Sequence, residues 1–576
     1  MKTKFDFYDY FIFVVILLIT IFIGLYFGLH LNEKLKKLWY RFFRKTKVQK
    51  VENEENKTME YLTANQSMGA FPIALSLLST FFSSSSLLGF PAEVYQYGIQ
   101  YWMIVIGVSF APIVGAFGTG PFFANLKIVS VFEYLKMRYN SEYARLLGVT
   151  LYLIRTLIAM GIVIYGPATA LSSLTDFSTE ISILLIGLIA TFYTTIGGIK
   201  AVIWTDVFQT IIMFAGVIAV IIKGTYDVGG ISNLWNINSK GGRLNFFVID
   251  PNPLIRQSFW SLVLGSFVAW TSSYGIDQQM VQRYSAAKTK RTAQIALLLN
   301  IPGVILLISL CCFSGLVLYA NFSQCDPLTN NKQSGVSNPN QLLPYFVMQK
   351  FNKIIFIPGL FLSSIFCASL SSVSSALNSM SACIWRDYLM RINKFKNFND
   401  VRSSRTTKII ALLCGLLCTG MGFLISRLGS NLIQISGTIN GSLQAPIIGI
   451  FFLSCLFPFN NIYGLFAGAL SGFVIGCWLS LGSFITKPNF PKLPVSTENC
   501  TINYYRSSLE ANNLNGFDRI YSVSYMWLSP IGVFFTIVIG VIVSLVTNKI
   551  FKIKYEIDDS LIIYRAFRKH NKINRF

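Results

Sequence analysis

Charged residues are scarce in this chain, and histidine is almost absent. Only 13% of the 576 residues are Asp, Glu, Lys or Arg, and the two histidines are His30 and His570, so a histidine-based catalytic triad or metal cluster is excluded. The sequence has no Gly-x-x-x-x-Gly-Lys-Ser/Thr loop, which argues against ATP-driven pumping. It also has no arginine-rich voltage sensor and no Thr-Val-Gly-Tyr-Gly filter, which argues against an ion channel. No motif in it indicates an enzyme.

The ten cysteines carry no metal-ligand spacing, and most of them lie in apolar segments, where cysteine behaves as a small hydrophobic residue. Only Cys325 and Cys500 fall in loops that we place outside the cell. Such loops permit a disulfide, but the sequence does not test the geometry that a disulfide needs. We therefore leave their pairing open, and we expect no cofactor.

Apolar residues, in contrast, dominate the composition and come in blocks. Hydrophobic residues make up 53% of the chain and the mean hydropathy is +0.54. The apolar blocks are roughly twenty residues long, the length that crosses a bilayer as a helix. The sequence therefore predicts an all-α polytopic membrane protein. About thirteen transmembrane segments are expected, at 11–31, 67–90, 100–124, 143–172, 179–197, 202–223, 258–281, 292–320, 356–385, 406–427, 431–457, 461–483 and 526–548.

The net charge of +23 could indicate a nucleic-acid partner, but its placement favours a membrane protein. Roughly two-thirds of the Lys and Arg residues fall in loops on one predicted side, which the positive-inside rule assigns to the cytoplasm. With the basic cluster at 34–50 inside, the N-terminus lies outside, and an odd number of spans places the C-terminus inside. The sequons at Asn321 and Asn499 then lie outside and are candidate glycosylation sites.

Two of the predicted spans are interrupted by polar residues at membrane depth, at 79–91 and at 270–278. The first interruption contains four consecutive serines, which cannot share one helix face. This favours a broken helix that lines a cavity over a continuous helix with its serines bonded to the preceding turn. Two broken helices at corresponding places in two five-helix units predict an inverted-repeat transporter with its site near the membrane midplane.

The domain organisation follows from these spans. We expect, in chain order, an N-terminal transmembrane helix (1–31), a basic cytoplasmic loop (32–66), an inverted-repeat transport core (67–457, with repeats 67–223 and 258–457), two accessory helices with an extracellular loop at 484–525 (458–548), and a basic cytoplasmic tail (549–576).

A hydroxyl-rich run lies within the predicted span 356–385. As a helix, this run places four oxygen-bearing side chains on one face at i, i+3, i+4 and i+7, namely Ser371, Ser374, Ser375 and Asn378. Hydrocarbon cannot satisfy these groups, so the face needs a neighbouring helix, water or a small hard cation. The spacing alone leaves all three open.

Two charged residues inside the spans each allow two interpretations. Asp206 is either a helix N-cap or first-turn acid near the membrane interface, or it is a cation ligand or the counter-charge that tunes one. Arg155 lies several residues inside its span. It either pairs with an acidic or carbonyl group or extends to the interface along its aliphatic stem, and we favour the second interpretation.

Several runs of residues, in the right order over nearly the whole chain, resemble the sodium:solute symporter family. The runs are Gly89-Phe-Pro-Ala-Glu-Val-Tyr-Gln-Tyr-Gly98, Phe132-Glu-Tyr-Leu-Lys-Met-Arg-Tyr139, Tyr193-Thr-Thr-Ile-Gly-Gly198, Trp204-Thr-Asp-Val-Phe-Gln209, Gln278-Gln-Met-Val-Gln-Arg-Tyr284 and Ser374-Ser-Ala-Leu-Asn-Ser379. Within the family the chain looks most like the branch of sodium-coupled monocarboxylate, sodium-dependent multivitamin and iodide transporters, and the loop runs at 242–253 and 325–327 look closest to the monocarboxylate members.

The resemblance implies a LeuT-like core of five plus five helices with sites at its breaks. The implied sodium ligands are Ser79, Phe82, Ala368, Ser371 and Ser372. A second implied sodium site comprises Asp206, Ser374 and Ser375, with Asn378 as a coupling residue. The implied substrate cavity comprises Thr80, Ser83, Ser86, Ser273, Tyr274, Thr438 and Asn440.

The function implied by the resemblance is sodium-coupled symport. The expected solute is a small organic anion of the monocarboxylate type, imported across the plasma membrane by alternating access, with Na⁺, the solute and the lipid bilayer as partners and no nucleic acid. Vitamins such as biotin or pantothenate and iodide-like anions fit the same residues. A competing hypothesis is a channel-like or sensory protein that keeps the fold without coupled transport. A substrate-induced current that vanishes without sodium would separate the two.

Overall fold

The computed structural model describes residues 5–28, 61, 64–126, 128, 130–175, 177–351, 354–427, 432–488, 490–500, 516–552 and 558–566. The predicted loop 32–66 and the tail from 549 lie largely outside these residues. Within the described part, the chain is helical and contains no strand beyond one isolated bridge between Met68 and Ala287. The all-helical prediction is confirmed.

Ten described helices are long and apolar enough to cross a membrane, or eleven if one bent pair counts as a span. Each of the thirteen predicted segments falls on helical structure, but the number of membrane crossings stays a prediction. The helices that correspond to these segments are α1 (Phe7–Gly28), α4 (Ala70–Phe81) with α5 (Ser84–Tyr97), α6 (Ile104–Val114) with α7 (Gly120–Leu126), α9 (Glu142–Leu174), α10 (Thr179–Asp227), α12 (Phe259–Gly275) with α13 (Gln278–Ser285), α14 (Lys290–Phe322), α17 (Ile357–Cys383), α19 (Asp400–Ser426), α20 (Leu432–Leu456), α21 (Ile462–Thr486) and α22 (Leu528–Phe551).

Two predicted spans, 179–197 and 202–223, both lie in α10, which consists of two helices that follow one another directly and meet at a kink. Its one non-helical residue is Gly198, with φ 65° and ψ −178°. A side chain is strained at this φ, and a Cβ added there would lie 2.7 Å from the ring of Tyr61. Glycine therefore lets the chain kink where we expected a short connection.

Both predicted helix breaks are present. Helices α4 and α5 meet at an angle of 59°, and the two residues between them, Phe82 and Ser83, have extended or irregular backbone angles. The second break separates α12 from α13, where the Asp277 carboxylate accepts a hydrogen bond from the backbone N–H of Gln279 and caps α13. A break frees backbone carbonyl and N–H groups at membrane depth, so each break supplies polar atoms to the interior of the bundle.

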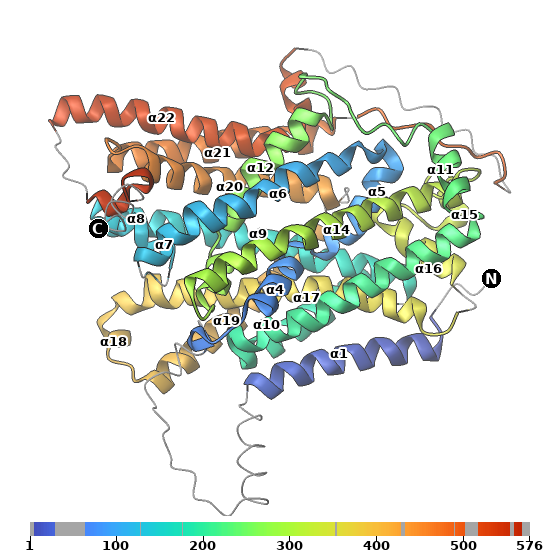
Figure 1. Cartoon of the computed structure of the whole chain (residues 1–576), viewed down its shortest axis with the longest axis horizontal. Helices are drawn as coiled ribbons and strands as arrows, with labels where there is room; N and C mark the ends of the chain where they lie inside the picture. The colour runs from blue at the N-terminus through green and yellow to red at the C-terminus, as the bar shows by residue number, and fades with distance from the viewer. Residues whose placement is uncertain are drawn as a thin grey trace, which may run out of the picture.

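The long helices run roughly side by side, with α17 among them (Figure 1). Among the helices that are long and apolar enough to cross a membrane, α17 is the most enclosed. In its apolar stretch of 18 residues, 94% of the residues are buried, against 28% in the corresponding stretch of α22. It packs against α1, α4, α9 and α10. The hydroxyl-rich run therefore lies at the centre of the protein rather than at its lipid-facing surface.

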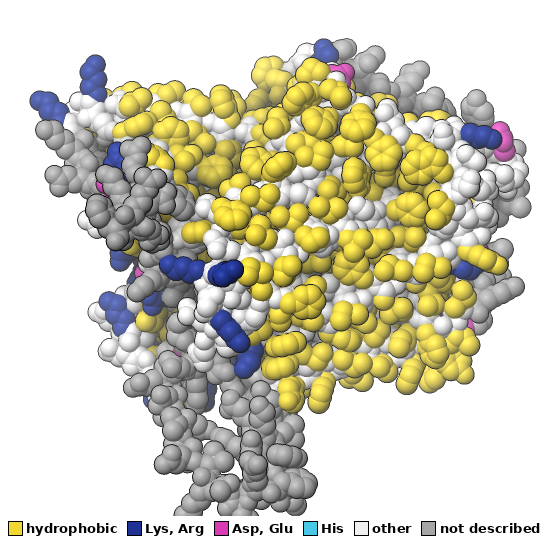
Figure 2. Space-filling view, in the orientation of Figure 1, with side chains coloured by type: hydrophobic (Ala, Val, Ile, Leu, Met, Phe, Trp, Pro, Cys, Tyr) yellow, Lys and Arg dark blue, Asp and Glu magenta, His cyan; other side chains and the backbone are white. Residues whose placement is uncertain are grey.

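Hydrophobic side chains cover the face between the two ends of the bundle, and Lys and Arg gather mainly at one end (Figure 2). Helix α1 begins at the end opposite to the one where α22 finishes (Figure 1). This arrangement suits a membrane band with a basic cytoplasmic side, although the sidedness itself stays a prediction.

The end of the bundle that we predict to be extracellular contains a disulfide between Cys325 and Cys500, with 5.2 Å between the Cα atoms. The two sequons nearby differ in their surroundings. The Asn321 amide donates to the backbone carbonyls of Gly224 and Val317 at 3.0 and 2.9 Å. Asn499 is exposed, and its amide donates to the side chain of Gln324 at 2.6 Å. Of the two, Asn499 is the more accessible acceptor for a glycan.

Candidate functional site

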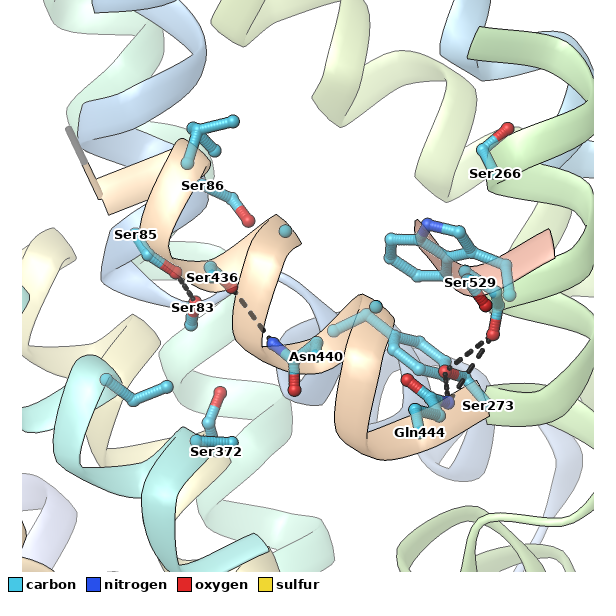
Figure 3. A pocket seen from close by; sticks show the side chains of 18 of the residues that line it. Ser83, Ser85, Ser86, Ser266, Ser273, Ser372, Ser436, Asn440, Gln444 and Ser529 are labelled. Carbon is cyan, nitrogen blue, oxygen red and sulfur yellow. Dashed lines mark hydrogen bonds between the residues drawn. The ribbon is translucent and has the colours of Figure 1, made fainter. Parts of the chain in front are cut away.

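A cavity of about 240 Å³ lies beside the break between α4 and α5. Its walls come from both broken helices, from α9, α17 and α20, and from the start of α22. The volume is slightly below the usual range of ligand pockets, about 300–1,000 Å³, so the cavity suits a small solute. Ten of its polar side chains are labelled in Figure 3, namely Ser83, Ser85, Ser86, Ser266, Ser273, Ser372, Ser436, Asn440, Gln444 and Ser529.

Five of the seven residues predicted for the substrate cavity line it, namely Thr80, Ser83, Ser86, Ser273 and Asn440. The other two do not. Tyr274 is fully buried and donates its hydroxyl hydrogen to the side chain of Asn300. Thr438 faces a separate small hollow against α21, and its carbonyl accepts a hydrogen bond from Ser442.

The hydrogen bonds around the cavity leave some polar atoms free for a ligand. Ser83 and Ser85 are hydrogen-bonded to one another at 2.5 Å. The Asn440 amide donates to Ser436 at 3.1 Å, whereas its Oδ1 is buried without a partner. Because a buried acceptor without a partner is costly, a donor on a bound solute or on water would stabilise Asn440.

Arg155 and Asp277 contribute the charges in the cavity wall. The Nη1 group of Arg155 donates to Asp277 Oδ2 at 2.7 Å, and Nη2 donates to Gln444 at 3.3 Å. Its Nε is buried without an acceptor. The expectation that Arg155 extends to the membrane interface is wrong, because a carboxylate from the second break holds the guanidinium against the cavity.

The predicted sodium ligands lie together where α17 crosses the end of α4. Ser372 donates to the backbone carbonyls of Thr80 and Ala368 at 3.0 and 3.2 Å. Ser371 donates to the Ser79 hydroxyl at 2.9 Å. The remaining ligand, Phe82, is the C-cap of α4 and is fully buried. A hard cation prefers oxygen ligands such as hydroxyl and carbonyl groups, so the groups at this crossing could bind one.

Asp206 lies well inside α10 and is fully buried, so the helix N-cap interpretation is wrong. Its Oδ2 accepts hydrogen bonds from Ser76 at 2.5 Å and from Arg283 at 3.1 Å, whereas Oδ1 has no partner. Arg283 is also fully buried and donates to Ser76, to the carbonyl of Gln279 and to Ser375. One guanidinium thus joins α4, α10, α13 and α17.

The other residues expected at this second site lie on the same helix, α17. Ser374 and Ser375 both donate to the backbone carbonyl of Ser371, at 3.0 and 2.7 Å. The Ser375 oxygen also accepts the hydrogen bond from Arg283. Asn378 is fully buried, and neither its amide oxygen nor its amide nitrogen has a partner.

Residues 61–476 match the model of the sodium:solute symporter family. The chain belongs to this family. It is 36% identical to sodium-coupled monocarboxylate transporter 1 of Xenopus laevis over 95% of this chain and 86% of that protein. It is 35% identical to the sodium-dependent multivitamin transporter of Oryctolagus cuniculus over 85% of this chain and 78% of that protein. The symporter is thus a multi-pass membrane protein that couples the transport of a solute to sodium.

Solved structures of transporters share the fold of this symporter. A Na⁺-coupled sialic acid symporter matches with a TM-score of 0.70 at 20% identity, covering 94% of this chain and 98% of that one. Mhp1, a nucleobase-cation-symport-1 family transporter, matches with a TM-score of 0.52 at 14% identity, covering 85% of this chain and 94% of that one.

Sequence reasoning missed Arg283 and Asp277 as parts of the site. Both lie in or beside the run 278–284 that carried the family resemblance, and Asp277 directly precedes α13. A charged residue at membrane depth needs an opposite charge nearby. Pairing the few intramembrane acids with the few intramembrane arginines could have identified both residues.

Proposed function

We propose that this symporter imports a small organic anion of the monocarboxylate type across the plasma membrane, together with sodium. The main support for this proposal is the position of Arg155 in the wall of the small cavity. Arg155 is cationic, and its buried Nε has no acceptor. The cavity also lies next to the place where α17 crosses the end of α4, which is rich in oxygen atoms. A carboxylate on the solute would accept hydrogen bonds from the guanidinium, and charge assistance makes such bonds strong. The identity to a monocarboxylate transporter supports the same solute class.

The first sodium ion would bind at Ser79, Phe82, Ala368, Ser371 and Ser372. The hydroxyls of Ser371 and Ser372 donate to oxygens of the opposing helix, Ser79 Oγ and the Thr80 carbonyl. A cation between the helices would be held by the same oxygens once the two hydroxyl hydrogens rotate away. Sodium would then hold α17 to the break through ion–oxygen contacts, beside the cavity that Thr80 and Ser372 also line.

A second sodium ion would bind at Asp206 with Ser374 and Ser375. Arg283 already neutralises Oδ2 of Asp206, so the unpaired Oδ1 is the atom left for an ion. Asn378 lies one helical turn from Ser374, and its buried amide lacks partners in this conformation. Sodium binding at the second site would change the contacts of this amide, which would make Asn378 a coupling residue.

Alternating access would arise from movement of the two broken helices within five-plus-five repeats at 67–223 and 258–457. The proposed orientation places the N-terminus outside, the C-terminus inside and a glycan at Asn499. Each positive charge that crosses contributes about 2.3 kcal/mol per 100 mV. Two sodium ions with one monoanion would therefore carry net positive charge inward and generate a current.

The experiment is sodium-dependent uptake of a panel of labelled solutes by cells that express the chain. The panel would contain a short monocarboxylate, biotin, pantothenate and iodide, since the multivitamin relative makes vitamins the second candidate. We expect monocarboxylate uptake to dominate and Arg155→Gln to reduce it at least tenfold. Dominant uptake of a vitamin or of iodide, or unchanged monocarboxylate uptake by the variant, would contradict the proposal.

A further inference from the structure

The last membrane helix, α22, supplies one wall of the cavity although it lies outside the proposed transport core. It packs on α20, α21 and α12. Tyr525 and Met526, in the short turn before it, and Ser529, in its first turn, line the cavity. An accessory helix thus reaches the space that the two broken helices enclose.

Glycines on two core helices make room for this approach. A Cβ added to Gly437 on α20 would lie 2.4 Å from the Tyr525 ring, and one added to Gly265 on α12 would lie 2.4 Å from the Met526 carbonyl. Real Cβ atoms essentially never lie so close to another atom. A larger residue at either position would push the start of α22 out of the cavity wall.

The turn before α22 is also held in place by hydrogen bonds. The Ser524 hydroxyl donates to the carbonyl of Arg256 at 2.5 Å, and the Ser524 N–H donates to the carbonyl of Pro253 at 3.0 Å. Ser524 itself is fully buried. The hydrogen bonds of Ser524 and the packing of Tyr525 and Met526 therefore hold the turn, and the turn positions Ser529 at the start of α22.

The Ser529 hydroxyl is a polar group without a partner. The residue is 3% exposed, and its Oγ has no hydrogen bond. Two threonines further along the same helix bond to their own backbone: Thr536 donates to the Gly532 carbonyl at 2.8 Å, and Thr547 donates to the Val543 carbonyl at 2.6 Å. In Figure 3, Ser529 lies on the same side of the cavity as Ser266 and Ser273, and Ser83 and Ser85 lie on the opposite side.

The guanidinium of Arg155, which would bind the solute carboxylate, belongs to a chain of hydrogen-bonded polar groups. Arg155 donates to Gln444, and Gln444 donates to Ser273 at 3.1 Å. Ser273 lies on the same side of the cavity as Ser529 (Figure 3). A small acid with its carboxylate at Arg155 would therefore present its remaining atoms within the space that Ser529 lines.

We propose that Ser529 determines specificity by donating a hydrogen bond to a polar group of the solute other than its carboxylate. The inference rests on the proposed function and narrows its substrate class to monocarboxylates that carry a hydroxyl or oxo group. An unsubstituted acid would leave the Ser529 hydroxyl unpaired. Sites built to hydrogen-bond a substrate group discriminate against analogues that lack it for this reason.

The test compares uptake of lactate with uptake of propionate, which has the same carbon skeleton without the hydroxyl. The chains compared are wild type, Ser529→Ala and the control Thr536→Val, which deletes a hydroxyl of α22 that is bonded to its own backbone. We expect wild type and the control to prefer lactate. We expect Ser529→Ala to lose about three- to tenfold of that preference, the size of one hydrogen bond, because lactate uptake falls more than propionate uptake. An unchanged ratio, or an equal loss for both acids, would overturn the inference.

A second experiment tests whether the side chain at position 529 faces the cavity and can be reached from water. Ser529→Cys should react with a small methanethiosulfonate reagent added in water, and lactate should slow the reaction, whereas Thr536→Cys should stay unlabelled. No labelling of Ser529→Cys would overturn the inference. Wild type without sodium-dependent uptake of either acid would overturn the proposed function as well. Uptake of both acids at a ratio that Ser529→Ala leaves unchanged would overturn only the role of Ser529.

Discussion

Replacing Asp206 with asparagine would leave the Arg283 guanidinium buried beside a neutral amide. Both side chains are fully buried, and Nη2 of Arg283 lies 3.1 Å from Oδ2 of Asp206. Removing one partner of such a pair costs about 3–5 kcal/mol, because the other charge stays buried without compensation. We expect Asp206→Asn and Arg283→Gln each to lose stability of this order.

The double variant Asp206→Asn/Arg283→Gln should recover most of that loss. It contains no unpaired charge, and its amides can bond to Ser76 and Ser375, which already contact the pair. We expect a cost of about 1–2 kcal/mol relative to wild type, the scale of one or two imperfect hydrogen bonds. The recovery is the coupling energy that a double-mutant cycle measures.

The assay is thermal unfolding of wild type, the two single variants and the double variant, each purified in detergent. Unfolding is measured from the size-exclusion profile after heating. The control is Lys136→Gln, which breaks a surface ion pair with Glu142 whose side chains are 44% and 43% exposed. Surface pairs contribute about 0–1 kcal/mol, so the control should melt close to wild type. Single variants as stable as wild type, or a double variant no more stable than the singles, would refute the assignment of this pair as a compensated buried ion pair.

Two further predictions concern sodium and glycosylation. Ser371→Ala and Ser372→Ala should each raise the sodium concentration for half-maximal uptake about tenfold, because each removes one ion ligand, whereas Ser369→Ala, on the same helix but bonded to α5 and α9, should not. Unchanged sodium dependence in both ligand variants would contradict the site. Asn499→Gln should abolish the mobility shift on glycosidase treatment, and Asn321→Gln should leave it intact, since the Asn321 amide is engaged by two carbonyls; the reverse result would contradict the assignment.

Hydropathy and local chemistry were enough to predict the helices and both breaks. Four consecutive serines cannot share one face of a continuous helix, and the break at Phe82 and Ser83 lies where that reasoning placed it. The contact between Ser371, Ser372 and the end of α4 came from the family resemblance, because spacing alone ranked Ser371, Ser374 and Ser375 equally.

The direction of single side chains beside a break could not be predicted. Tyr274 lies one residue before the end of α12, where a small change in helix rotation decides between the cavity and Asn300. Thr438 and Asn440 are two residues apart on α20, so they point in different directions, and only Asn440 lines the cavity.

Contacts between elements far apart in the chain were also beyond the sequence. Arg283 meets Asp206 across 77 residues, and Arg155 meets Asp277 across 122 residues. Ser529 lies near the start of the predicted apolar span 526–548, and no motif in the sequence distinguishes it. Its position depends on Gly265 and Gly437, which lie on two other helices.

The most direct test of sodium-coupled anion import is the membrane current induced by a monocarboxylate in cells that express the chain, measured while external sodium is varied at constant ionic strength. Coupled transport predicts an inward current that saturates with both sodium and solute and disappears when sodium is fully replaced. A current that persists without sodium, or one that is ohmic and independent of the solute, would contradict it.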